Sequence, residues 1–191
     1  THEGYDATDP KVAPEGYLLR ANFGYSGKAG EGSGQVRYQT LQGLFFYKRQ
    51  NGPIDVAFLL FDATRCLRNS LLNTDLGDPA RPGRIYESRY IPFIDYVVRY
   101  SSVSSMIVEG VKPGDDPRLT TLWFLPAFQL TSVAAPVWVA AGEPLPAVAV
   151  SNHGDPSYIA QKALALKARL FPFPGRDGGN YLDPSTLFEG R

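Results

Sequence analysis

Five of the sixteen prolines in this 191-residue chain directly follow an aspartate. An Asp side chain accepts hydrogen bonds from backbone N–H groups ahead of it, and proline fixes φ near about −65° while removing a donor. Each pair therefore starts a turn or caps a helix, and together they divide the chain into short blocks. The pairs are Asp9-Pro10, Asp78-Pro79, Asp116-Pro117, Asp155-Pro156 and Asp183-Pro184.

Composition supports the same view of many short elements. The chain contains 19 glycines and 16 prolines, more than average usage, and a helical bundle would not carry so many helix breakers. Hydrophobic residues make up 43% of the sequence, which is enough to form a core and excludes wholesale disorder. At this length we expect a single domain.

These observations predict an α+β, mainly β fold. We expect one sandwich- or barrel-like domain of roughly seven to ten short strands, with two short helices near residues 63–73 and 156–170. This domain is predicted over residues 17–172. Both ends of the chain carry breakers without an apolar period, so residues 1–16 are expected to form an extended N-terminal arm and residues 173–191 an extended C-terminal tail.

The strand predictions rest on alternation and on short apolar runs. Asn51-Gly52-Pro53 is typical of a turn, so the runs on either side of it are expected to form a β-hairpin. Alternation of apolar and polar residues predicts a strand in each of two segments, 36–40 and 94–100. The apolar runs predict further strands at residues 17–25, 44–47, 54–61, 103–111, 119–125, 128–133, 137–141 and 147–150.

The helix predictions rest on caps and on apolar periodicity. Asp62 is the expected N-cap of the first helix, in which Cys66 lies on the apolar stripe and Arg65 faces away from it. Asp155 is the expected N-cap of the second helix, with Pro156 at its first position. The face of the second helix that we expect to be buried consists of Ile159, Ala163, Leu166 and Leu170.

Charge and cysteine content exclude several classes of protein. Nineteen Lys and Arg residues balance nineteen Asp and Glu residues, so no net field attracts nucleic acid, and we expect no nucleic-acid partner. Residues 119–142 carry no formal charge, but Pro126 and Pro136 interrupt them, so no membrane span is expected. The single Cys66 excludes a disulfide-stapled scaffold and leaves the cellular compartment open.

One loop could carry catalysis. His153 lies between an apolar run and the second predicted helix, where functional groups often sit. It could act as a general base oriented by Asp155, with Ser151 or Ser157 close by. Asp155 is already explained as a helix cap, and the G-x-S-x-G motif of many hydrolases is absent from the sequence. We therefore interpret His153 as a turn residue and keep it as the candidate should the protein be an enzyme.

Metal and cofactor signals are weak. Two histidines and one cysteine, far apart in sequence, do not have the spacing of a zinc site. The glycine-rich stretch over residues 24–34 departs from the phosphate-loop pattern, so we expect no cofactor. Oxygen ligands for calcium could come from two groups, although their usual role is turn formation. These candidates are Asp115 and Asp116 in one group, and Asp177, Asn180 and Asp183 in the other.

Three functions compete. We expect a non-enzymatic structural subunit of a homo-oligomeric assembly such as a shell, tube or fibre, because catalytic side chains are few, net charge is zero and aromatic residues are abundant. Self-association would use the terminal arms and exposed aromatics. The alternatives are a hydrolase-type enzyme centred on His153 and a β module that binds a small ligand or carbohydrate through Tyr and Trp.

Overall fold

A computed structural model of the chain describes residues 9–20, 34–78, 90–142, 145–151, 154–174 and 180–187. The chain is 35% helical and 18% strand, so the α+β class is confirmed, while the expectation of a mainly β fold is only loosely supported. The helices in this part are α1 (Gln35–Asn51), α2 (Val56–Phe58) and α3 (Tyr158–Leu170). The strands are β1 (Arg68–Asn69), β2 (Thr74–Asp75), β3 (Ile91–Pro92), β4 (Ser104–Glu109), β5 (Thr121–Pro126), β6 (Ala135–Trp138), β7 (Phe173–Pro174) and β8 (Asn180–Leu182).

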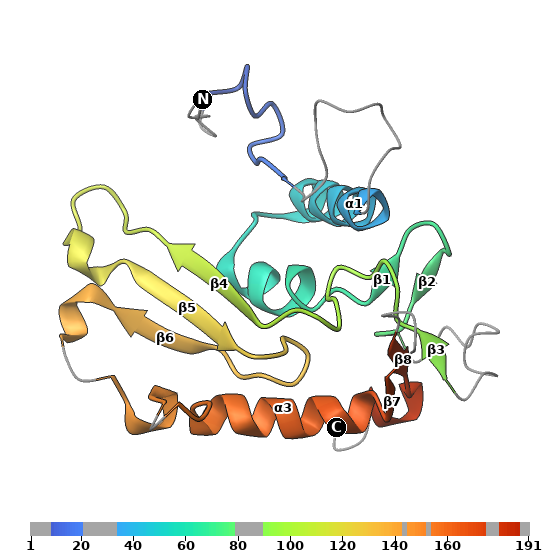
Figure 1. Cartoon of the computed structure of the whole chain (residues 1–191). Helices are drawn as coiled ribbons and strands as arrows, with labels where there is room; N and C mark the ends of the chain where they lie inside the picture. The colour runs from blue at the N-terminus through green and yellow to red at the C-terminus, as the bar shows by residue number, and fades with distance from the viewer. Residues whose placement is uncertain are drawn as a thin grey trace, which may run out of the picture.

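The strands form three small antiparallel sheets (Figure 1). β1 and β2 make a hairpin, β3 and β7 flank β8, and β4 and β6 flank β5. Within the described residues this arrangement differs from the sandwich or barrel that we expected. In Figure 1, α1 and α3 lie on opposite sides of the molecule, with α2 and the β4–β5–β6 sheet between them.

The segment expected to form strands at residues 36–40 and 44–47 is the helix α1. Five alternating residues fit a strand or one side of a helix, and here the buried residues Thr40, Leu44 and Phe45 follow helical spacing. Gly52, with φ 155°, ends the helix, and a proline follows it. The expected hairpin turn is therefore a helix stop, since glycine and proline give the same signal in both settings.

The first predicted helix is also wrong in position. The Asp55 carboxylate accepts a hydrogen bond from the Phe58 N–H at 2.7 Å and starts α2, where a strand was expected over 54–61. A π-helical turn, Leu59–Ala63, continues α2, and it contains Asp62, the expected cap. The predicted helix over 63–73 is thus replaced by a loop and the β1–β2 hairpin.

The contacts of the turn between β1 and β2 explain why this segment forms a hairpin and not a helix. The Asn69 side chain accepts a hydrogen bond from the Leu72 N–H at 3.0 Å, and Asn73 adopts a left-handed φ of 49°. Both features close a turn that a helix could not contain. Across the two strands, Arg68 and Asp75 form an ion pair at 2.8 Å.

Two of the later strand predictions are confirmed, because β4 lies within the range 103–111 and β5 covers most of the range 119–125, ending one residue beyond it. β6 overlaps the strand expected at 137–141 but begins two residues earlier. Segments 94–100 and 128–133 are irregular, and the segment 147–150 contains a 3₁₀ turn. Residues 17–20 form no strand, and the rest of that predicted strand, 21–25, lies outside the described residues.

The helix α3 confirms the second helix prediction, but its cap and face differ in detail. Ser157, not Asp155, is the N-cap, and its hydroxyl accepts a hydrogen bond from the Ala160 N–H at 3.4 Å. Ala163 and Leu170 are buried as expected. Leu166 is 45% exposed, because it borders a cavity instead of packing into the core.

Buried apolar side chains form three clusters. The largest joins the segment after β3 to the end of α3 and to β8, and Phe93, Phe128 and Phe171 are at its centre. The second lies between α1 and α2. The third joins Leu60, on the π-helical turn, to Ile107 of β4 and Leu125 of β5.

The described parts of both chain ends pack within their own chain. β8 pairs with β3, and its Leu182 is fully buried in the largest cluster, so the expected extended tail over 173–191 is wrong for this part. At the other end, Val12 and Ala13 donate backbone hydrogen bonds to the Asp9 carbonyl, and Ala13 is buried. Residues 1–8 of the expected arm lie outside the described residues.

Within the described part of the chain, each helix is too short or too polar to cross a membrane.

Candidate functional site

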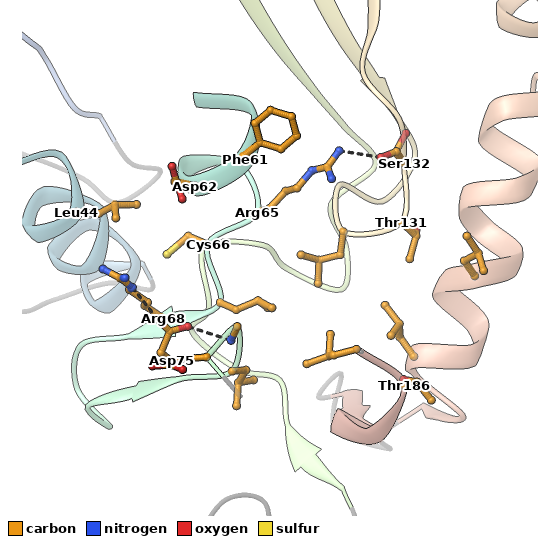
Figure 2. Close-up of a pocket in the computed structure, with 18 of the residues that line it drawn as sticks. Leu44, Phe61, Asp62, Arg65, Cys66, Arg68, Asp75, Thr131, Ser132 and Thr186 are labelled. Atoms are coloured by element: carbon orange, nitrogen blue, oxygen red, sulfur yellow. Dashed lines mark hydrogen bonds and ion pairs between the residues drawn. The ribbon is translucent and has the colours of Figure 1, made fainter. Parts of the chain in front are cut away.

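A cavity of about 800 Å³ lies where six segments of the chain meet, one of them α1 through Leu44 (Figure 2). The end of the π-helical turn, with Asp62 and Arg65, forms one wall, and the β1–β2 hairpin forms another. The loop over 130–132, the last turns of α3 and the 3₁₀ turn Pro184–Leu187 complete it. A volume of this size is typical of small-molecule sites.

Both signs of charge occur in the cavity lining. The arginines are Arg65, Arg68 and Arg169, and the aspartates are Asp62, Asp75 and Asp78. The Arg68–Asp75 ion pair belongs to the hairpin, and the Asp75 carboxylate also accepts a hydrogen bond from the Gly77 N–H at 2.9 Å. These two charges are therefore already satisfied by the fold.

Arg65 differs from Arg68 in its partners. Its Nη2 donates to the Ser132 carbonyl at 2.9 Å, and its guanidinium group lies 5.8 Å from the Phe61 ring centre. Its Nε is buried without a hydrogen-bond acceptor, and no carboxylate of the described chain forms an ion pair with it. Burial lowers the pKa of Arg65 below its ordinary value, and the group nevertheless stays protonated at neutral pH.

Cys66 is a core residue, as its place on the apolar stripe indicated. It is 4% exposed, and its side chain belongs to the cluster between α1 and α2. Burial raises the pKa of the thiol, which opposes formation of the nucleophilic thiolate. Although Cys66 borders the cavity, it has the environment of a structural cysteine.

Lys167 on α3 has a lowered pKa because of burial, a property that catalytic lysines share. Its Nζ donates to the Tyr100 carbonyl at 2.5 Å and lies 3.9 Å from the Tyr100 ring centre. It lines neither this cavity nor a smaller one beside β4. Its contacts attach α3 to the loop before β4, which is a structural role.

A second cavity of about 600 Å³ lies beside β4, with Leu41, Phe45 and Val97 among its apolar walls. Gln129, 5% exposed, also lines it. The Gln129 amide donates to the Ser104 carbonyl and to the Ser105 hydroxyl, both at 2.8 Å, while its Oε1 is buried without a donor. The amide therefore fixes the loop after β5 against the start of β4.

One face of the β4–β5–β6 sheet is apolar. The strand registers and the alternation of side chains place six apolar residues on this face, and we name them the apolar face. Its two β4 members, Met106 and Val108, are 65% and 68% exposed, and the other four are half-buried. None of the six belongs to the three core clusters. The apolar face consists of Met106, Val108, Leu122, Phe124, Ala135 and Val137.

The catalytic candidates of the sequence are not brought together by the described structure. His153 lies outside the described residues. The Ser151 hydroxyl donates to the backbone carbonyl of Asp155 and not to its carboxylate. Ser157 is occupied as the cap of α3. The described geometry of this loop is that of a chain entering a helix.

The calcium candidates serve local turns. The Asp116 carboxylate accepts hydrogen bonds from Arg118, with the shortest at 2.7 Å, and Asp115 accepts from the Lys112 N–H at 3.2 Å. Asp183 accepts from the Ser185 N–H and hydroxyl, and Asn180 is a buried β8 residue. Asp177 lies outside the described residues. The described residues contain no cluster of three or more potential metal ligands.

Sequence reasoning missed Gln129 as a buried polar residue and Arg65 as a half-buried one. Arg65 was expected on the exposed side of a helix, and its partner Ser132 is 67 positions away along the chain. No local sequence pattern predicts a contact over such a separation. Comparison with protein-family models, curated proteins and solved structures finds no match to this chain.

Proposed function

We propose that this chain is a non-enzymatic subunit of a homo-oligomeric assembly of the shell, tube or fibre type, in which copies meet through the apolar face. The observation that supports this proposal is the composition and exposure of that face, which has six apolar side chains and no charge. Contiguous apolar surfaces outside the core are typical of interaction sites in soluble proteins.

A second copy of the chain is the partner that fits best. The chain has zero formal net charge, so copies do not repel each other as they approach. Two sheets pack face to face at about 10 Å, and a twofold axis would place the same face on both sides of the contact. The proposal does not use the terminal arms, because the described part of the C-terminal segment packs on its own chain.

A ligand-binding module is the second candidate, favoured by the cavity around Arg65. A hydrolase centred on His153 remains a hypothesis that a screen of ester, glycoside and phosphate substrates would test, with His153→Ala as the diagnostic variant.

A lysine placed on the apolar face tests the proposal. Val108→Lys puts a charge where two copies would meet, and an exposed edge strand tolerates lysine, so the fold should persist. Sedimentation velocity should show self-association weakened about tenfold or more relative to the unchanged chain. The matched control is Leu71→Lys, which changes an apolar residue that is 73% exposed in the β1–β2 turn. Equal association by both variants and the unchanged chain would exclude this face as the contact.

A further inference from the structure

We propose that the cavity beside Arg65 binds a small molecule that has an apolar body and one carboxylate, with the Arg65 guanidinium as its anchor. The inference is independent of self-association. It rests on an arginine at a cavity wall whose hydrogen-bonding capacity the described chain leaves incomplete.

The hydrogen bonds that Arg65 makes to the described chain leave part of its donor capacity unused. Its one hydrogen bond to the described chain goes to a neutral acceptor, the Ser132 carbonyl at 2.9 Å, and its buried Nε has no acceptor. Because Nε is closed to solvent, a ligand oxygen would have to reach the Nη atoms, of which Nη2 already donates to the Ser132 carbonyl. The two oxygens of a carboxylate match two adjacent N–H groups of a guanidinium edge.

Arg68 borders the same cavity but already has a carboxylate as its hydrogen-bond partner. Its Nε donates to the Asp75 carboxylate at 2.8 Å. Arg65 has no such carboxylate among the described residues, and burial lowers its pKa without an opposing acidic group. The positive charge of Arg65 is therefore open to neutralisation by a ligand anion.

The rest of the lining selects the kind of anion. Asp62 also borders the cavity, and its negative charge disfavours a doubly charged phosphate more than a singly charged carboxylate. Apolar side chains from four separate segments, Phe61, Leu130, Leu166 and Leu187, border the same space and are at least partly exposed. They would contact an apolar body, so the ligand class is an amphipathic monocarboxylate.

Calorimetric titration with octanoate tests the proposal, with octanol as the neutral probe of equal chain length. We expect octanoate to bind the unchanged chain at least about tenfold more tightly than octanol. Arg65→Gln should lose that preference. Arg118→Gln should keep it, because Arg118 is an exposed arginine paired with Asp116 at 2.7 Å and does not border the cavity.

A second measurement uses the unchanged chain, so that the test does not depend on whether Arg65→Gln folds. In side-chain ¹⁵N NMR, octanoate should shift the Arg65 Nε–H resonance, and octanol should not. The proposal is overturned if octanoate does not bind, if octanoate and octanol bind equally, if the Arg65 resonance stays in place, or if inorganic phosphate binds more tightly than octanoate.

Discussion

Arg65 and Cys66 are adjacent in the chain, yet their side chains enter different environments. The Arg65 guanidinium extends to the Ser132 loop, while the Cys66 sulfur lies on the opposite side of the backbone, toward α1 (Figure 2). One residue supplies a charge at a cavity wall and the other fills a core. The backbone after the π-helical turn thus separates a polar site from an apolar cluster within two residues.

The buried thiol gives a pH-dependent stability that can be measured. Burial raises the folded-state pKa of Cys66, whereas in the unfolded chain it is about 8.5. The stabilisation is therefore complete below about pH 8.5 and is lost as pH rises through the folded-state pKa. Denaturant unfolding between about pH 7.5 and pH 9.5 should show a decrease in the free energy of unfolding that Cys66→Ala reduces. An identical decrease in both proteins would contradict the assignment.

What the sequence predicted at this scale depends on whether the signal was local. Cys66 could be assigned to the core, because a small apolar residue on an apolar stripe is buried whether the segment is helix or loop. The position of Arg65 could not be predicted. It depends on where the π-helical turn ends and on a loop 67 positions away.

Among the elements, α3 shows how closely a cap can be located from sequence. The sequence offers Asp155, Pro156 and Ser157 in succession, and both Asp and Ser are good N-caps. The structure uses Ser157, whose hydroxyl accepts from the Ala160 N–H, while the Asp155 carbonyl accepts from the Ser151 hydroxyl. The helix was predictable, but the choice between Asp155 and Ser157 as its cap depended on the path of the preceding loop.

Removing each of the two possible cap side chains should change the free energy of unfolding by a different amount. Ser157→Ala should lower the free energy of unfolding by about 1 kcal/mol, because it removes the cap of α3. Asp155→Ala changes an exposed side chain and should stay within about 0.5 kcal/mol of the unchanged chain. Urea denaturation of the two variants compares them directly. A larger cost at Asp155 would restore it as the functional cap.

α1 shows the opposite case, in which a local pattern was ambiguous. Its alternating residues at 36–40 and its terminal Asn51-Gly52-Pro53 fit a hairpin as well as a helix with a stop signal. Packing decides between them. Thr40, Leu44 and Phe45 are buried together only with helical spacing. The ring centres of Phe45 and of Phe58 in α2 are 5.0 Å apart.

On the scale of the whole molecule, the three core clusters include no residue of the apolar face. The β4–β5–β6 sheet is packed against the π-helical turn through Ile107 and Leu125, and its other face carries the exposed Met106 and Val108. The sequence indicated an α+β chain with zero net charge. Which face of which strand would stay exposed depends on strand register, which no segment of the sequence defines alone.

Self-association of the chain is the central claim, and sedimentation equilibrium tests it most directly. The chain mass is 21.0 kDa. A standard interface buries about 800 Å² on each partner, more than six side chains provide, so we expect weak association and the measurement should extend to high micromolar concentrations. The account predicts a mass that rises with concentration to a multiple of the chain mass. A mass of 21.0 kDa at every concentration would contradict it.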